Sequence, residues 1–165
     1  MEGHIVATVT AEDNTVTSYG DFLSALSAAQ GSVGSTLKLL DDVTYSSDTD
    51  AIAIASKLTL DLNGCTLQLN GTHGFIYLNA SAADLTIQDG KTEGGGKISS
   101  SSDYAILADE GKLTITGGIY ETTVGAACTL QVEGDNASVY ISGGEFRQNN
   151  NYNALYVSDG SVMIS

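Results

Sequence analysis

The stretch Leu58-Thr-Leu-Asp-Leu-Asn-Gly-Cys-Thr-Leu-Gln-Leu69 recurs along the chain in looser copies. The copies begin at Leu37, Leu85, Leu113, Val139 and Val162. In chain order the starting residues lie 21, 27, 28, 26 and 23 positions apart. Self-similarity at a period in the twenties indicates a solenoid, in which each repeat stacks on its neighbours.

Each repeat divides into three short strand-like segments separated by corners. Residues 58–62 alternate apolar and polar side chains, as expected for a strand with one inward and one outward face. Asn63 and Gly64 tolerate the positive φ of a sharp corner before the second strand. The third strand ends each repeat, and polar linkers such as residues 109–112 return the chain. We therefore predict an all-β, right-handed parallel β-helix with three strands per turn and about five turns over residues 36–165.

Stacking the repeats predicts an inward ladder of side chains on each wall. The first wall contributes Leu60, Ile87, Ile115 and Ile141, the second Leu67, Ile98, Tyr120 and Phe146, and the third Ile54, Leu78, Leu107, Val132 and Val157. Residues 1–35 precede this solenoid and predict a short hairpin followed by an amphipathic helix that begins after Asp21 and ends near Gly31. We expect the helix to cap the first turn, whose strand edges would otherwise be unpaired.

Composition excludes several classes of partner. The net charge is −14, from twenty acidic and six basic residues, so nucleic acid is excluded as a partner. No segment approaches the roughly 18 apolar residues of a membrane helix, so we expect no membrane insertion. Cys65 and Cys128 are predicted to be free and largely buried. We expect residues 1–165 to be a fragment, with further domains, the signal and the anchor elsewhere in the parent chain.

The run Tyr19-x-x-Phe-Leu-x-Ala-Leu, followed by Leu37-x-Leu-Leu-x-Asp-Val-Thr44 and the repeat at Leu58, resembles a known group of proteins. It is similar to the pectin-lyase-like right-handed β-helix regions of large secreted, adhesin-like surface proteins of Gram-positive gut bacteria. The resemblance covers residues 16–165 and implies a secreted, cell-surface location. Its motifs belong to the scaffold, and a fold alone transfers no activity.

Signs of catalysis are absent from the pattern, and we predict a non-enzyme without a cofactor. A glycoside hydrolase requires two carboxylates about 5–9.5 Å apart, but the outer ladder that contains Asp61 holds only this one acid. Arg147 is predicted to pair with Glu121 on the neighbouring strand. Neither His4 nor His73 is predicted to have an acidic partner. The outward threonines do not continue as the flat ladder of an ice-binding surface. We predict no metal site, although calcium at the acidic loop Asp41–Asp50 stays an open question.

The outer side of the third strands carries the strongest sign of function. Phe75, Tyr77, Tyr104 and Ile106 are predicted to form an apolar and aromatic block, with Tyr152 and Tyr156 farther along. Such surfaces mark binding sites, or they are covered by another segment, here the N-terminal hairpin or a neighbouring domain of the parent chain. We predict a binding or adhesion module for a host protein (such as an immunoglobulin or mucin) or a glycan. The alternatives are a fragment of a carbohydrate-active lyase or hydrolase and a passive spacer.

Overall fold

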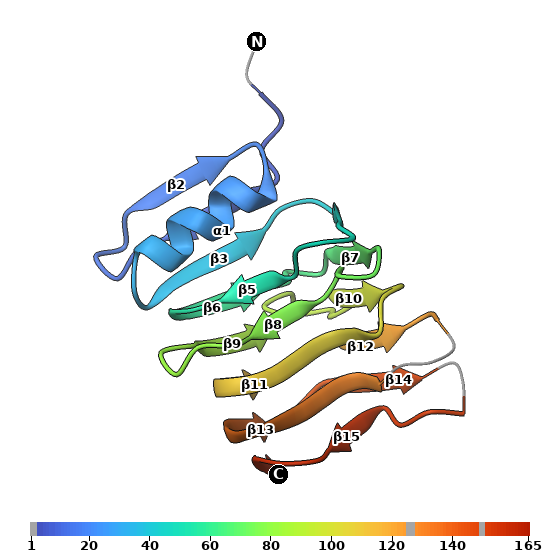
Figure 1. Ribbon diagram of the computed structural model, residues 1–165. Coiled ribbons are helices and arrows are strands. Elements are labelled where there is room, and N and C mark those ends of the chain that lie inside the picture. The colour runs from blue at the N-terminus through green and yellow to red at the C-terminus, as the bar shows by residue number, and fades with distance from the viewer. Residues whose placement is uncertain (1–2, 125–127, 149–150) are drawn as a thin grey trace.

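A computed structural model of the chain describes residues 3–124, 128–148 and 151–165, and it is a β-solenoid of about five turns (Figure 1). The second strands of successive turns are β4 (Val43–Ser46), β7 (Thr66–Asn70), β10 (Lys97–Ser100), β12 (Ile119–Thr122) and β14 (Glu145–Gln148). They form a five-stranded parallel sheet.

The first and third strands form the other walls. The first strands are β3 (Ser35–Leu39), β6 (Lys57–Asp61), β9 (Asp84–Gln88) and β16 (Ser161–Ile164), and the third strands are β5 (Ile52–Ile54), β8 (Ile76–Leu78) and β15 (Leu155–Val157). Two strands are long, β11 (Tyr104–Ile115) and β13 (Cys128–Ile141). Each forms the third strand of one turn and continues without a break as the first strand of the next turn. The predicted parallel β-helix is therefore confirmed, but residues 109–112, predicted as a linker, lie within β11.

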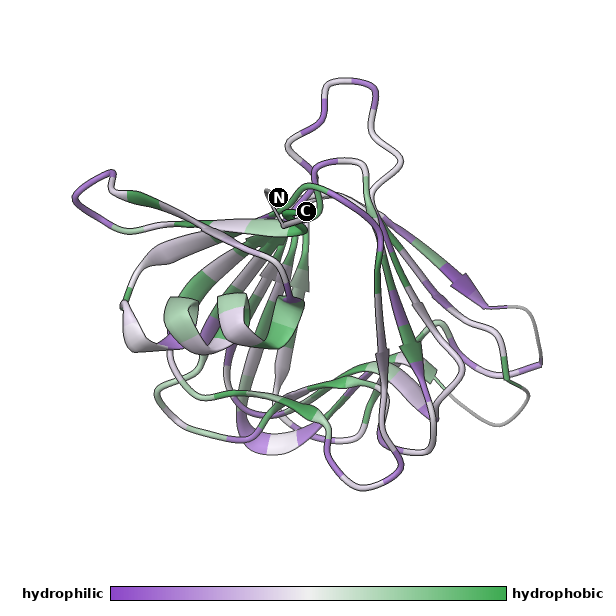
Figure 2. Cartoon of the chain, turned by 90° about the horizontal axis from the view of Figure 1, so that it is seen from above, coloured by the Kyte–Doolittle hydropathy of each residue, from purple (hydrophilic) through white to green (hydrophobic). Residues whose placement is uncertain are grey.

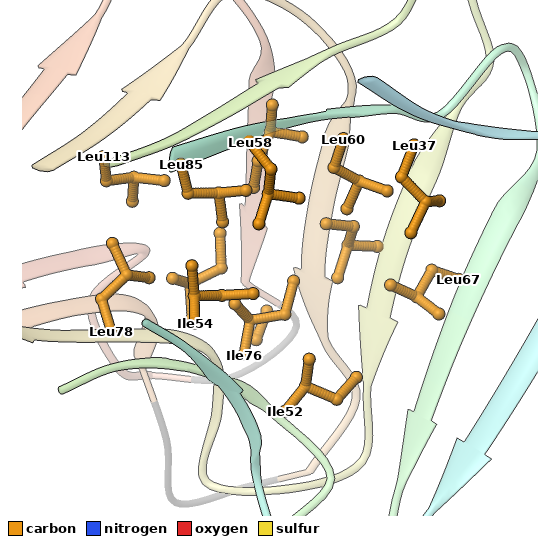
Figure 3. Packing of buried hydrophobic residues seen from close by; sticks show 14 of the residues in the cluster. Leu37, Ile52, Ile54, Leu58, Leu60, Leu67, Ile76, Leu78, Leu85 and Leu113 are labelled. Carbon is orange, nitrogen blue, oxygen red and sulfur yellow. The ribbon is translucent and has the colours of Figure 1, made fainter. Parts of the chain in front are cut away.

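The core fills the space between the walls (Figure 3). Register confirms the predicted ladder Leu60–Ile87–Ile115–Ile141 on the first wall. It also confirms Leu67–Ile98–Tyr120–Phe146 on the second wall. Removing each such aliphatic side chain from water contributes roughly 1.5–3 kcal/mol, so stacked ladders hold turns that are distant in sequence.

The predicted third ladder contains one error. Leu78 pairs with Ala108, and Leu107 pairs with Tyr77 on the outer side. Ile106 is fully buried and faces Ile76. The prediction was therefore wrong for both residues: Ile106 points into the core, and Leu107 belongs to the outer column.

The N-terminal segment closes one end of the solenoid. The hairpin of β1 (Ala7–Thr10) and β2 (Val16–Tyr19) pairs with β3 through β1, in antiparallel register. The predicted helix is α1 (Phe22–Gly31), and the Asp21 carboxylate caps it by accepting a hydrogen bond from the Ser24 amide at 2.8 Å. Viewed along the stack, α1 lies at the near end with its green apolar residues mixed among paler ones (Figure 2). Its buried residues Phe22, Ala25, Leu26 and Ala29 join the core of the solenoid.

Candidate functional site

Three of the predicted aromatic residues meet on the outer side of the third strands. The Phe75 ring lies edge-on to the rings of Tyr77 and Tyr104, with centroid distances of 6.0 and 5.5 Å. Phe75 is itself nearly buried, at 8% exposed, while both tyrosines are half-buried. Edge-to-face contacts of this kind hold aromatic rings in fixed orientations. The cluster is therefore a packed floor with two accessible rings. We call the surface that holds this cluster the third-strand face. It is the outer side of β5, β8, residues 104–108, residues 128–132 and β15.

Register defines the central column of this face as Ala53, Tyr77, Leu107, Gln131 and Tyr156. Leu107, at 7% exposed, takes the place predicted for Ile106. Tyr156 and Tyr152 lie in the last turn, 43% and 53% exposed. The structure thus brings Phe75, Tyr77 and Tyr104 into contact, and it places Tyr152 and Tyr156 farther along the chain.

A shallow depression of about 420 Å³ lies over the first part of this face. Its lining consists of Thr49, Asp50, Ala51, Ala53, His73, Phe75, Tyr77, Asn79 and Leu107. The aromatic and aliphatic members form its floor, and hydroxyl, carboxylate, imidazole and amide groups stand at its rim. A concave apolar surface with a few polar groups is the usual form of a ligand site. Because β1 pairs with β3, the hairpin extends the wall of first strands and does not cover this depression.

Sequence reasoning missed His73, Asn79 and Leu107 as lining residues. His73, Phe75 and Tyr77 are spaced by two, which is the signal that could have placed His73 on the same side of the strand. The His73 and Phe75 rings stack at 6.1 Å, and the His73 Nδ1 lies 2.9 Å from the Asp48 carbonyl oxygen, to which it donates. The imidazole is therefore held at the rim by its neighbours on two adjacent turns.

The two accessible tyrosines sit in an acidic environment. The Tyr77 hydroxyl donates to the Asp109 carboxylate at 3.2 Å. Burial, followed by the negative charge of Asp109, raises the pKa of Tyr77 above its ordinary value. Burial and the charge of Glu133 raise the pKa of Tyr104 in the same direction. Both hydroxyls therefore remain protonated at neutral pH, and that of Tyr77 donates its proton to Asp109.

Two charge pairs differ from the sequence-based predictions. Arg147 pairs with Glu145 on its own strand, with Nε 2.6 Å from Oε1, so the predicted Arg147–Glu121 pair was wrong. Glu121 accepts instead from Lys97 at 3.0 Å. The prediction for His4 was also wrong, because docking of β1 beside β3 places its Nε2 2.7 Å from the Asp41 carboxylate. Both this pair and the Arg147 pair are solvent-exposed, and surface pairs contribute little.

The acidic loop Asp41–Asp50 is held by hydrogen bonds to the next turn. The Asp42 carboxylate accepts from the Thr66 amide at 2.7 Å, and the Asp48 carboxylate accepts from the Thr72 amide at 2.9 Å. Within residues 3–124, 128–148 and 151–165, no three acidic, histidine or cysteine side chains cluster as metal ligands. Cys65 and Cys128 are free, as predicted, but only half-buried.

The described residues therefore define a β-solenoid that bears an aromatic-floored depression on one wall. None of its described helices is long and apolar enough to cross a membrane. We found no matching family model, no matching curated protein and no matching solved structure.

Proposed function

We propose that the chain is a non-catalytic binding module that engages a host protein or a glycan through the third-strand face. The observation that carries this proposal is the depression of about 420 Å³, whose floor includes Phe75 and Tyr77 and whose rim includes His73 and Asn79. Because the Phe75–Tyr77–Tyr104 rings already pack together, little side-chain freedom is lost when a ligand covers them.

The chemistry of the face suits either kind of ligand. A tyrosine ring presents a large apolar area with a hydroxyl at its edge, which is why tyrosine is frequent at binding hot spots. Asp50 and Asn79 at the rim offer acceptors and a donor to hydroxyl or amide groups. The acidic surroundings of Tyr77 and Tyr104 favour a neutral or basic ligand over an acidic one.

The setting of the module is a further part of the proposal. We place it in a secreted bacterial cell-surface protein with additional domains, because residues 16–165 resemble the β-helix regions of adhesin-like surface proteins. A solenoid suits that role, since stacked turns present one extended wall.

The test measures binding to immobilised mucin, to immunoglobulin and to a glycan array. Ala53→Gln places a neutral, longer side chain in the depression from an exposed position and leaves the core unchanged. The double variant Tyr77→Ala/Tyr104→Ala removes both accessible rings. We expect each to weaken binding about tenfold or more, as for hot-spot residues. Tyr140→Ala is the matched control, because Tyr140 is exposed on the wall of first strands.

Circular dichroism and thermal melting confirm that each variant is folded. The proposal is contradicted if all variants bind equally well, or if the unmodified chain binds none of mucin, immunoglobulin and the glycans of the array. Release of sugar from a polysaccharide panel would support the carbohydrate-active alternative, and a folded protein that captures nothing would support a spacer.

A further inference from the structure

The N-terminal end of the solenoid has three strand edges, one for each wall, and the cap covers two of them. The edge of β3 pairs with β1. The edge of β5 is covered by Gln30 of α1, whose Nε2 donates to the Ala53 carbonyl at 2.9 Å and whose Oε1 accepts from the Ala55 amide at 2.8 Å. Among the described residues, β4 pairs with β7 alone and is the end strand of its sheet.

A groove of about 470 Å³ lies against this open edge. One side of the groove is β4 itself, and the other is the start of the cap, including Asp21, Phe22 and Leu23. Leu23 is 53% exposed although it is a large aliphatic residue on a capping helix. The groove therefore combines free backbone hydrogen-bonding groups with an accessible apolar side.

The open edge is short, with four residues in β4, but it lacks the other features that usually prevent strand addition. Proteins protect edge strands with lysine, proline or bulges. Residues 43–46 read Val-Thr-Tyr-Ser and contain neither charge nor proline, and their pairing with β7 is regular. An extended peptide that adds to such an edge gains main-chain hydrogen bonds, while alternate side chains enter neighbouring pockets.

Charge at the groove identifies the kind of peptide. Asp21 and Asp42 line it, and none of the described residues that line it is basic. Both carboxylates are fixed in place, Asp21 by the Ser24 amide at 2.8 Å and Asp42 by the Thr66 amide at 2.7 Å. The Ser24 hydrogen bonds also hold the pKa of Asp21 below its ordinary value, so this group is ionised at neutral pH.

We propose that the free edge of β4 binds an extended, basic peptide segment as an added strand. Apolar side chains of the segment contact Phe22 and Leu23, and the alternate basic side chains lie near the carboxylates of Asp21 and Asp42, which also line the groove. This surface lies at the N-terminal end of the solenoid, and the inference is independent of the function proposed for the third-strand face.

The test is an NMR titration of the ¹⁵N-labelled chain with the blocked hexapeptide acetyl-Lys-Val-Lys-Val-Lys-Val-amide. We expect saturable shifts at the amides of residues 21–23 and 43–46, and none with the corresponding Glu-Val peptide. Two further probes carry N-methyl groups on all lysines or on all valines. Amides of alternate residues point to opposite edges of a strand, so one methylated peptide should bind as before and the other about tenfold or more weakly.

Charge is tested with Asp21→Asn/Asp42→Asn, in which each side-chain oxygen still accepts its backbone hydrogen bond. This variant should bind the Lys-Val peptide several-fold more weakly. Glu93→Gln/Asp103→Asn removes the same charge from exposed residues outside the groove and should bind like the unmodified chain. Equal binding of both methylated peptides, or shifts confined to other strands, would overturn the proposal.

Discussion

The Asp89 carboxylate joins two turns of the solenoid by accepting a hydrogen bond from the Gly64 amide at 2.7 Å. Its second oxygen accepts from the Gly96 amide, also at 2.7 Å. Gly64 has a φ of 76°, the left-handed conformation of a corner, and its amide has no strand partner there. Asp61 acts similarly at the neighbouring position, accepting from the amides of Asn63 and Gly90 at 3.0 and 2.8 Å. Asp61 and Asp89 therefore each provide a hydrogen-bond acceptor for backbone amides at the corners of the solenoid.

Replacing Asp89 with alanine should lower the free energy of unfolding by about 2–4 kcal/mol, since two partly buried amides lose their acceptor. Asp89→Asn keeps one side-chain oxygen and should cost less. Urea unfolding measures both changes. Asp103→Ala, at an exposed acid, is the control and should change stability by less than about 0.5 kcal/mol. Equal effects of Asp89→Ala and Asp103→Ala would show that the corner hydrogen bonds do not contribute.

Gln30 should govern exchange at the edge of β5. Gln30→Ala removes both bonds to this edge, so the Ala55 amide should exchange with solvent faster than in the unmodified chain. The loss of stability should be about 1–2 kcal/mol. Hydrogen exchange read residue by residue checks this, with amides in β12 as an internal control because that strand is paired on both sides. Unchanged exchange at Ala55 would contradict the role assigned to Gln30.

The sequence could predict the first and second walls because apolar and polar residues alternate over most of their strands. Leu60, Ile87 and Ile115 each lie between polar neighbours, so only one register buries them, and Ile141 follows in the same ladder. Residues 105–108 read Ala-Ile-Leu-Ala, so the residues on both sides of this strand are apolar. The pattern therefore could not decide between Ile106 and Leu107, and pairing with β8 selected Ile106 for the core.

The errors in the charge pairs have a different origin. The ladder correctly places Glu121 beside Arg147. On the other side of β12 the register pairs Ser99 with Glu121, and Lys97, two residues earlier on β10, reaches diagonally to that carboxylate. Arg147 then pairs with Glu145, two residues earlier on the same face of its strand. Such choices between neighbouring acids depend on side-chain positions that a repeat alignment does not contain.

The aromatic cluster was predictable in outline because Phe75 and Tyr77 are on one side of one strand, whereas the rim of the depression comes from loops.

Glu121 should make stability depend on acidic pH. Burial alone would raise the pKa of Glu121, but the hydrogen bonds from Lys97 and Ser99 outweigh it and hold the pKa below its ordinary value. A carboxyl whose pKa is lowered in the folded state stabilises that state above the unfolded pKa, near 4.3. This contribution is lost as the pH falls from there through the folded pKa.

Urea unfolding of the unmodified chain and of Glu121→Gln between pH 3 and 7 tests this dependence. The stability difference between the two should shrink as the pH falls below about 4.3. Glu93→Gln, at an exposed acid, is the control and should leave the shape of the curve unchanged. A constant difference across the range would contradict the assignment.

Tyr120 should make stability depend on alkaline pH. Its ring is fully buried and stacks on Phe146 at 4.9 Å, and its hydroxyl donates to the Gly117 carbonyl at 2.7 Å. Burial, aided by the negative charge of Asp89, raises the pKa of Tyr120 far above its ordinary value. A raised folded pKa stabilises the protein fully below the unfolded pKa, near 10, and this contribution declines as the pH rises beyond it.

Tyr120→Phe keeps the stacked ring and removes both the hydrogen bond and the titrating group. At pH 7 it should cost about 1 kcal/mol, the value of one buried hydrogen bond. Above pH ~10 the unmodified chain should lose stability more steeply than the variant, so the two curves converge. Urea unfolding from pH 7 to 11 measures this, with Tyr140→Phe as the control because Tyr140 is exposed. Parallel curves for the unmodified chain and Tyr120→Phe would show that Tyr120 ionises without unfolding the core.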